Sequence, residues 1–504
     1  MTTDTIAEST PAPNNRHPRG LRTLFFTEMW ERFSFYGMRG LLILFMTAST
    51  AHGGLGLDDV TATAMYGLYN AAVYVATLPG GWIADRLMGA QRTVWYGGII
   101  IMLGHFTLAI PAVPSFYLGL VFLVLGTGLL KPNISAIVGE LYPEGGQRRD
   151  AGFTFFYMGI NLGALFGPFI TGYLASSEYF GWHYGFAAAG VGMLFGLVQY
   201  RLSRNHLGDA GMYPDHLRPD GKTNAPPRFG WLIVGIGVGI VAFLTVLGIT
   251  GHLDIHAATL ARWATIFIAV IGTLYFVGVF VFGRLNTTER KHIIVIAVLI
   301  VANAFFWSGF EQAGSSLNLF AERYTDRMVL GVFEIPTAWF QSLNPSYILI
   351  LAPFFASLWV NLGRRNLNPS IPAKFALGLI QMGLGFLVMY GASTYVIKGQ
   401  SVLPTWLMLT YLIHTMGELC LSPVGLSAMT KLSPKRFVSQ MMGIWFLSTA
   451  LGEILAGLLA GRFNPESLND MPNLYLHIVA FGVGSGVILL LFTKPLKKLM
   501  DDSP

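Results

Sequence analysis

Residues 28–39 read Glu-Met-Trp-Glu-Arg-Phe-Ser-Phe-Tyr-Gly-Met-Arg and lie within a long apolar run near the start of the chain. In an α-helix, Glu28, Arg32 and Arg39 fall on one stripe, with Glu31 beside it. A charge at the centre of a bilayer costs roughly 2.5–3.5 kcal/mol even on a lenient insertion scale. The four charges must therefore pair or face water inside a protein, which marks a functional site. The alternative is a buried ion-pair cluster that only fixes helix packing.

The composition of the whole chain is that of a membrane protein. Of its 504 residues, 53% are hydrophobic and only 12% are charged, whereas soluble domains contain about 25% charged residues. The net charge of +6 is then expected to reflect basic cytoplasmic loops and not nucleic-acid binding. The single cysteine, Cys420, excludes an internal disulfide. Residues 1–20 are polar, lack the apolar core of a signal peptide and predict a disordered cytoplasmic tail.

Apolar runs long enough to cross a bilayer, which takes about 20 residues each, recur along the chain. They predict an all-α membrane protein with 14 spans, at residues 21–48, 60–84, 93–112, 116–139, 151–175, 184–203, 229–250, 258–283, 292–321, 339–361, 373–396, 403–429, 438–461 and 475–496. If the N-terminus is inside, 24 of the 32 Lys and Arg residues fall on the inner side, five on the outer side and three within spans. Because cytoplasmic loops collect basic residues, this bias predicts that both termini are cytoplasmic.

The longest polar connection divides the chain. It covers residues 204–228 and is expected to be a cytoplasmic linker after an N-terminal six-helix bundle at 21–203. Two inserted transmembrane helices at 229–288 would precede a C-terminal six-helix bundle at 289–497, and residues 498–504 would form a second cytoplasmic tail. Two six-helix halves indicate an internal duplication of the kind found in transporters.

The loop from Gly81 to Arg92 reads Gly-Trp-Ile-Ala-Asp-Arg-Leu-Met-Gly-Ala-Gln-Arg. It resembles the G-x-x-x-D-R-x-G-R-R pattern of the major facilitator superfamily. The resemblance implies that Asp85 and Arg86 form a gate latch at the cytoplasmic end of the second span. An ordinary basic turn would also suit both residues.

The first helix resembles a narrower family. Its residues Glu28 to Gly37 are similar to the E-x-x-E-R-F-x-Y-Y-G signature of the proton-dependent oligopeptide transporters. Phe156 to Gly163 resembles the same family's F-Y-x-x-I-N-x-G motif, and Lys131 matches its basic residue in the fourth span. Other matching segments follow in the expected order, at Phe306–Trp307, Glu311–Gln312, Asn344–Pro345, Glu418–Pro423 and Gln440–Trp445.

On these motifs the chain is identified as a bacterial member of that family, including the two extra spans. The resemblance implies a major facilitator fold and proton-coupled import of di- and tripeptides by alternating access, in the bacterial inner membrane. One position departs from the signature, because Phe35 stands where the family has Tyr. That hydroxyl lies near the binding site in family members, so its loss bears on substrate preference, unless Phe35 is simply part of an aromatic wall.

The charges within the spans favour a zwitterionic substrate independently of the resemblance. The first half carries a net charge of +1 from Glu28, Glu31, Arg32, Arg39 and Lys131. The second half carries −2 from Glu311 and Glu418, or −3 with Glu453, which could be a gate or a packing residue. A cavity between the two halves would have one positively and one negatively charged wall. Such walls suit a substrate carboxylate near Arg39 and Lys131 and a substrate ammonium near Glu418.

Polar and aromatic side chains complete the expected binding site. Asn161 and Asn344 each offer the donor and acceptor that a peptide backbone needs, although helix-to-helix hydrogen bonds would use the same groups. The resemblance adds five lining residues, which are Tyr36, Tyr69, Trp307, Ser422 and Trp445.

Proton coupling is also implied by the resemblance. It assigns this role to two groups, which are Glu28, Glu31 and Arg32 with Lys131, and Glu311 opposite Arg39. Protonation of a carboxylate would free its cationic partner and let the two halves rock.

Other classes of protein fit less well. Gly221-Lys222-Thr223 lacks the leading glycine of an ATP-binding loop, since position 216 is His216. Gly484-Ser485-Gly486 lacks the spacing of a serine nucleophile motif, which disfavours an intramembrane hydrolase. A symporter of the same fold for nitrate, a peptide-like drug or another zwitterionic or anionic solute stays open. We expect no enzyme activity, cofactor, metal site, nucleic-acid ligand or obligate protein partner.

Overall fold

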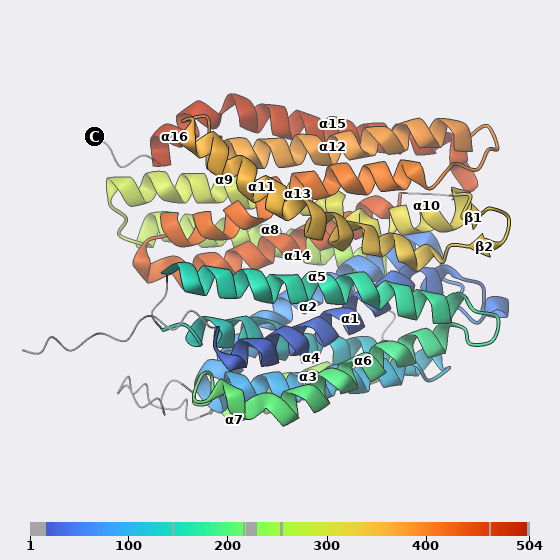
Figure 1. The fold of residues 1–504 in the computed structure, drawn as a ribbon, viewed down its shortest axis with the longest axis horizontal. Coiled ribbons are helices and arrows are strands. Elements are labelled where there is room, and N and C mark those ends of the chain that lie inside the picture. Colours follow the sequence, from blue (N-terminus) through green and yellow to red (C-terminus); the bar gives the residue numbers. More distant parts are fainter. Residues whose placement is uncertain are drawn as a thin grey trace, which may run out of the picture.

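The structure, a computed structural model, describes residues 17–143, 146–214, 217, 229–252, 256–462 and 465–500. Within these ranges the regular structure is helical, apart from one short antiparallel hairpin (Figure 1). The hairpin pairs β1 (Met328–Val329) with β2 (Phe333–Glu334), with Val329 opposite Phe333. The long helices lie side by side with roughly common axes, as expected for a bundle that crosses a bilayer.

Six long helices form the first half. They are α1 (Arg19–Thr47), α2 (Asp59–Ile83), α3 (Ala90–Leu108), α4 (Val113–Glu140), α5 (Gly146–Ser176) and α6 (Trp182–Ser203), with the short turns η1 (Thr50–His52), η2 (Ala84–Met88) and η3 (Arg204–Leu207). Helix α1 packs against α5 and α6, while α3 packs against α4. Gly97 and Gly126 let α3 and α4 approach closely, since a Cβ on Gly97 would lie 2.8 Å from the carbonyl oxygen of Gly126.

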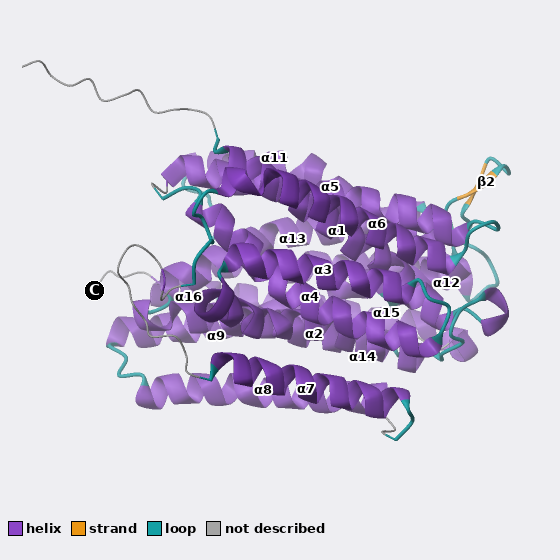
Figure 2. Cartoon of the chain, turned by 90° about the horizontal axis from the view of Figure 1, so that it is seen from below, coloured by secondary structure: helices purple, strands orange, loops and turns teal. Residues whose placement is uncertain are grey.

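Two helices lie between the halves in sequence, α7 (Gly230–Ile249) and α8 (Ala257–Phe282). Figure 2 shows them along one side of the remaining helices. Helix α7 has no buried residue in its most apolar stretch, so nearly its whole surface suits contact with lipid. Helix α8 packs against α2 of the first half and α14 of the second half.

The second half begins at Asn286, whose side chain accepts a hydrogen bond from the backbone of Glu289 in a capping box. It contains α9 (Thr287–Phe310), η5 (Glu311–Gly314), α10 (Ser316–Tyr324), η6 (Thr337–Ser342), α11 (Leu343–Arg364), α12 (Ile371–Val396), α13 (Thr405–Leu432), η7 (Lys435–Phe437), α14 (Val438–Ala460), η8 (Pro465–Asp470), α15 (Met471–Leu491) and α16 (Thr493–Met500). Helix α12 packs on α13 and α15, and α14 packs on α9.

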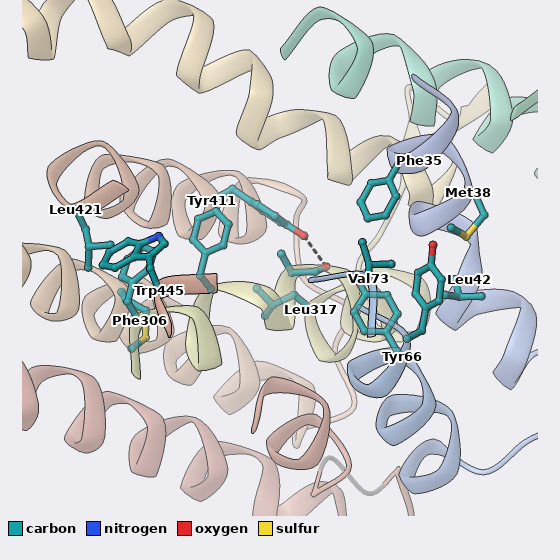
Figure 3. Packing of buried hydrophobic residues seen from close by; sticks show 14 of the residues in the cluster. Phe35, Met38, Leu42, Tyr66, Val73, Phe306, Leu317, Tyr411, Leu421 and Trp445 are labelled. Atoms are coloured by element: carbon teal, nitrogen blue, oxygen red, sulfur yellow. Dashed lines mark hydrogen bonds between the residues drawn. The ribbon is translucent and has the colours of Figure 1, made fainter. Parts of the chain in front are cut away.

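The halves meet along several helices. Helix α2 packs against α14, α5 against α11 and η6, and α1 against α10 and η6. Gly67 and Gly457 bring α2 and α14 into backbone contact, because a Cβ on Gly67 would lie 2.8 Å from the carbonyl oxygen of Glu453. The core of buried apolar residues runs through both halves, as Figure 3 shows for Phe35 and Tyr66 on one side and Tyr411 and Trp445 on the other.

Each predicted apolar run coincides with a long helix. Among the described residues, 11 helical segments are apolar and long enough to cross a membrane. Helices α1, α2 and α3 are not among them, so the predicted count of 14 spans is only partly reproduced; in α1, buried charges interrupt the apolar sequence. The run predicted at 292–321 is not one continuous α-helix, since η5 interrupts it between α9 and α10 at Glu311–Gly314.

The bounds predicted for the two tails and the linker differ in detail from those in the structure. Of the N-terminal tail predicted at 1–20, residues 1–16 lie outside the described part of the chain, and α1 already begins at Arg19. Residues 498–500 close helix α16, and 501–504 lie outside the described residues. The linker predicted at 204–228 starts as the 3₁₀ turn η3 and lies partly outside the described ranges.

Candidate functional site

Helix α1 carries a buried ion cluster near its middle. Arg32 pairs with Glu28 one turn earlier, with Nε 3.1 Å from Oε1, and it also pairs with Glu31. All three residues are buried. The pairing follows from the sequence, since residues i and i+4 of a helix lie on the same face. Two carboxylates share one guanidinium, so the cluster is one positive charge short when both are ionised.

Lys131 of α4 is the next cation. Its Nζ lies 3.9 Å from the centre of the Tyr74 ring on α2, which is a cation–π contact. Within the described ranges no carboxylate lies within ion-pair distance of Lys131. It is nevertheless exposed to the field of Glu28 and Glu31. The predicted grouping of Lys131 with the first-helix carboxylates stays a prediction, and the sequence did not suggest Tyr74 as the direct neighbour of Lys131.

A second buried ion pair connects the two halves. Arg39 of α1 pairs with Glu311, the first residue of η5, and its Nε donates a 2.5 Å hydrogen bond to the hydroxyl of Tyr66 on α2. Both charged residues are buried. The interruption after α9 places Glu311 at the end of a helix, where its side chain reaches α1. Figure 3 shows Tyr66 beside the residues of α1.

Glu453 of α14 is a further buried carboxylate near this pair. It is 2% exposed, and its Oε2 has no hydrogen-bond partner among the described residues. Its charge acts on Arg39, Lys131 and Glu311. A buried, unsatisfied carboxylate oxygen is costly and calls for an explanation in function. Both predicted roles of Glu453, as a gate residue and as a packing residue, stay open at this point.

Glu418 lies apart from these ion pairs, on α13. Its Oε2 accepts a 2.8 Å hydrogen bond from Nδ2 of Asn344 on α11, and the same nitrogen donates to Thr415 at 3.0 Å. Ser422 lies one turn further along α13, and its buried hydroxyl oxygen has no partner in the part of the chain that the structure describes. The structure therefore brings together the predicted Glu418, Asn344 and Ser422, while Thr415 is a neighbour that the sequence did not suggest.

The predicted polar and aromatic residues of the first half lie on three helices. Nδ2 of Asn161 on α5 donates to the carbonyl oxygen of Tyr157 at 2.9 Å, so its amide oxygen is not used in that bond. The half-buried Tyr36 ring has its centre 5.7 Å from the guanidinium carbon of Arg39. Tyr69 of α2 is buried, and no described residue hydrogen-bonds its hydroxyl.

Phe35, which stands where the family signature has Tyr, packs against a charged side chain. Its ring centre lies 5.2 Å from the guanidinium carbon of Arg32 and 5.3 Å from the centre of the Tyr36 ring. A phenyl ring can make this cation–π contact without a hydroxyl. The aromatic-wall reading of Phe35 is therefore compatible with its surroundings.

Trp307 and Trp445 lie on α9 and α14 of the second half. Nε1 of Trp307 donates to Oδ1 of Asn303 at 3.0 Å, and Nδ2 of Asn303 donates to Ser448 at 2.8 Å. Trp445 is buried and packs edge-to-face on Phe375. Sequence reasoning missed Asn303, although an asparagine one turn before Trp307 in an apolar run was a usable signal.

A third ion pair, which the sequence did not predict, joins the halves where α2 begins and α10 ends. Arg323 at the end of α10 binds Asp59 in the first turn of α2 with two bonds of 2.6 and 2.8 Å. Nearby, Asn318 donates to the carbonyl oxygen of Gly40 at 3.0 Å, and Trp339 donates to that of Phe169 at 3.0 Å. All these contacts cross from one half to the other.

The predicted latch residues Asp85 and Arg86 lie at the opposite end of α2, in the π-helical turn η2. Gly89 ends this turn with φ of 80°, and a Cβ there would lie 2.5 Å from the carbonyl oxygen of Met212. Only glycine suits such a site. The turn is thus held against the chain that follows α6.

Comparison with known proteins gives consistent matches. Residues 91–473 match the family model described as the POT family. The chain is 42% identical to the peptide transporter YePEPT of Yersinia enterocolitica over 98% of both chains. It is 37% identical to the di-/tripeptide transporter of Lactococcus lactis subsp. lactis over 96% of this chain and 97% of that one.

Solved structures of peptide transporters have the same fold as this chain. A crystal structure of a peptide transporter POT in complex with sulfate superposes with a TM-score of 0.86 at 42% identity, over 96% of each chain. A POT family transporter in complex with 5-aminolevulinic acid superposes with a TM-score of 0.84 at 35% identity, over 95% of this chain and 97% of that one.

Proposed function

Because this chain belongs to the POT family, we propose that it is a proton-coupled symporter that imports di- and tripeptides by alternating access. It is an integral membrane transporter of the bacterial inner membrane and not an enzyme. The family that the first-helix motif indicated is thereby confirmed. Relatives named as peptide and di-/tripeptide transporters cover almost the whole chain, which supports a peptide substrate.

The proposed architecture has 14 spans with both termini in the cytoplasm. Two six-helix halves, at 21–203 and 289–497, would form the major facilitator fold, with the linker at 204–228 and the inserted helices at 229–288 between them. The helix at each apolar run supports the span count. The excess of basic residues in alternate loops supports the orientation.

The observation that carries the proposal is the buried pair of Arg39 and Glu311 across the two halves. Breaking a buried pair by neutralising one partner costs about 3–5 kcal/mol, because the other charge is left without compensation. A proton that binds Glu311 would therefore destabilise the contact between α1 and η5. The halves could then separate at the outer end, and a substrate carboxylate could bind the released Arg39.

The first-helix cluster would supply a second proton-dependent switch. Arg32 compensates only one of Glu28 and Glu31, so the remaining negative charge can be met by a proton or by the nearby Lys131. Movement of Lys131 away from Tyr74 and toward the carboxylates would couple this choice to the positions of α1, α2 and α4. Glu453 would form a third acidic position between the two switches.

In the proposed complex, the peptide carboxylate lies toward Arg39 and Lys131 and the peptide ammonium toward Glu418. Asn344 holds Glu418 in place and, with Asn161, offers hydrogen bonds to the peptide backbone. The remaining lining residues would be Tyr36, Tyr69, Trp307, Ser422 and Trp445. Each of these side chains is at least partly buried.

Alternating access also needs gates at both ends. We assign the outer gate to Asp59 and Arg323, whose ion pair joins α2 to α10. Asp85 and Arg86 would act at the inner end of α2. A proton that crosses about 100 mV supplies about 2.3 kcal/mol, and one pH unit adds about 1.36 kcal/mol. Together these energies could support a substrate gradient of several hundred-fold at roughly 1.4 kcal/mol per decade.

Uptake by protein reconstituted in liposomes tests the proposal. Dipeptide, tripeptide, free amino acid and nitrate should be compared with and without an imposed inward proton gradient. We expect gradient-dependent accumulation of the two peptides only. Accumulation of nitrate without peptide would favour the alternative symporter, and peptide uptake that ignores the proton gradient would refute the coupling. We propose no cofactor and no obligate protein partner.

A further inference from the structure

A cavity of about 660 Å³ lies between the inserted helix α8 and helices α9 and α14 of the second half. We call it the α8 groove. Its walls are formed by residues between Ile268 and Val281 of α8, between Ala297 and Phe305 of α9, and between Ile444 and Leu455 of α14. The lining is apolar apart from the hydroxyls of Thr273 and Ser448.

The groove is open toward the surroundings of the bundle. Lining residues Val277, Val281 and Val301 are 51%, 64% and 52% exposed. For a chain in a bilayer, this surface faces acyl chains and not water. An apolar cavity of this kind does not hold ordered water, which needs two to four polar partners. Its occupant must therefore be apolar where it lies between α8 and α14.

The inner end of the groove is basic. Arg436 of η7 binds Glu289 through two bonds of 2.9 Å, and it donates to the carbonyl oxygens of Gly283 and Arg284 at 3.0 and 3.3 Å. These bonds fix the turn between α8 and α9 and neutralise Glu289. Three further basic residues lie in this turn and at the start of α9, which are Arg284, Arg290 and Lys291, and we call them the basic cluster.

The cluster is within reach of the groove. Arg284 follows the lining residue Val281 by three positions and lies two residues beyond the end of α8 at Phe282. Arg284 and Arg290 are exposed. Basic residues between transmembrane helices on the cytoplasmic side are suited to anionic lipid head groups. The groove and the cluster therefore have the chemistry of the two ends of one phospholipid.

We propose that the α8 groove binds an anionic phospholipid of the inner leaflet. One acyl chain lies between α8, α9 and α14, and the phosphate lies at Arg284, Arg290 and Lys291. The inner-leaflet assignment rests on the orientation proposed above, whereas the groove and the basic cluster do not depend on it. This site gives the inserted helix α8 a function in lipid binding.

The same groove adjoins the proposed peptide site. Ser448 lines the groove and accepts the hydrogen bond from Asn303, which in turn accepts one from Trp307. Helix α8 also packs with α2 and α14 in a separate cluster that includes Ala71, Ile268 and Ile454. An acyl chain in the groove would therefore pack against α14 beside the hydrogen bonds that connect Ser448 with Trp307, and its loss should change peptide uptake.

Native mass spectrometry of the purified full-length protein tests binding directly. Phosphatidylglycerol and phosphatidylcholine with identical acyl chains are the two probes. We expect the parent protein to retain phosphatidylglycerol more strongly, by about fivefold for each basic residue that contacts the phosphate. Equal retention of the two lipids would overturn the assignment of the head-group site.

The groove itself is tested by Gly272→Leu. Gly272 lines the cavity, and a Cβ there would meet no atom within 4 Å, so a leucine can fill the space without a clash. The matched control is Gly278→Leu on the same helix, which has equal free space and does not line the cavity. We expect Gly272→Leu to lose bound phosphatidylglycerol and the control to keep it. Equal effects of the two variants would refute the acyl-chain position.

The head group is tested by the double variant Arg290→Gln with Lys291→Gln. Its control is Arg364→Gln with Arg365→Gln, which removes two exposed charges at the end of α11, away from α8. The preference for phosphatidylglycerol over phosphatidylcholine should fall in the Arg290→Gln, Lys291→Gln variant and persist in the Arg364→Gln, Arg365→Gln control. If Gly272→Leu instead changes the oligomeric state and leaves lipid retention intact, a second copy of the chain covers the groove and the lipid proposal is wrong.

Discussion

Replacing Asp59 by Asn should open the outer end of the transporter. In the structure, Arg323 holds Asp59 with two hydrogen bonds of 2.6 and 2.8 Å, and the two side chains are 26% and 9% exposed. A hydrogen bond to a charged group contributes about 1.5–3 kcal/mol net. Because part of the guanidinium is in contact with solvent, screening reduces the value for this pair to about 1–2 kcal/mol. At 1.4 kcal/mol per decade, the open population should rise about 5- to 30-fold.

Distances between spin labels on the two halves can measure this change. The chain has one cysteine, Cys420, which would first be replaced by Ser. Labels would then be attached at Tyr179, which is 92% exposed between α5 and α6, and at Val332, which is 88% exposed in the hairpin. Both positions lie outside the ion pair. We expect Asp59→Asn to shift the distribution toward longer distances.

A matched control breaks an ion pair that stays within one half. Glu334 lies 2.8 Å from Arg327 at the same end of the molecule, so Glu334→Gln removes a charge without freeing the halves. The double variant Asp59→Arg with Arg323→Asp should restore the closed population in part, since an arginine opposes the helix dipole in the first turn of α2. An unchanged distribution in Asp59→Asn, or an equal shift in Glu334→Gln, would show that the ion pair of Asp59 and Arg323 does not hold the halves together.

Three further substitutions separate binding from coupling. Lys131→Ala should abolish gradient-driven accumulation in liposomes, because the first-helix carboxylates lose their alternative cation. Counterflow, which needs no net proton movement, should persist. Normal accumulation by the variant would show that Lys131 is not a coupling residue. Glu418→Gln should raise the peptide concentration for half-maximal uptake about tenfold or more, as expected when a charge loses its partner, and an unchanged value would remove Glu418 from the ammonium site. Glu453→Gln should slow proton-driven uptake and leave counterflow intact, whereas a loss of thermal stability with normal coupling would make Glu453 a packing residue.

The sequence was sufficient to predict where the long helices lie and which charged residues pair within helix α1. Helical periodicity placed Glu28 and Arg32 together, and the structure pairs them. Hydropathy located every long helix, because a helix that crosses the bilayer needs a continuous run of about 20 apolar residues. Hydropathy did not reveal the interruption at Glu311–Gly314, since an apolar run is equally compatible with a continuous helix.

Contacts between distant segments could not be obtained in this way. Asp59 and Arg323 are far apart in sequence, and neither has a local pattern that identifies its partner. The pairing of Arg39 with Glu311 was anticipated only through the family resemblance. Likewise, the position of Tyr74 beneath Lys131 depends on how α2 packs on α4, which spacing along one helix does not determine.

The most direct test of the account is peptide accumulation by Glu311→Gln beside the parent protein. Both would be reconstituted in liposomes, and uptake of a labelled dipeptide would be measured with and without an inward proton gradient. The glutamine mimics a protonated Glu311 and cannot pair with Arg39 as an anion. If Glu311 is the coupling carboxylate, the variant should bind peptide and support counterflow but gain no acceleration from the gradient. Concentrative uptake by the variant with the pH dependence of the parent would contradict that role.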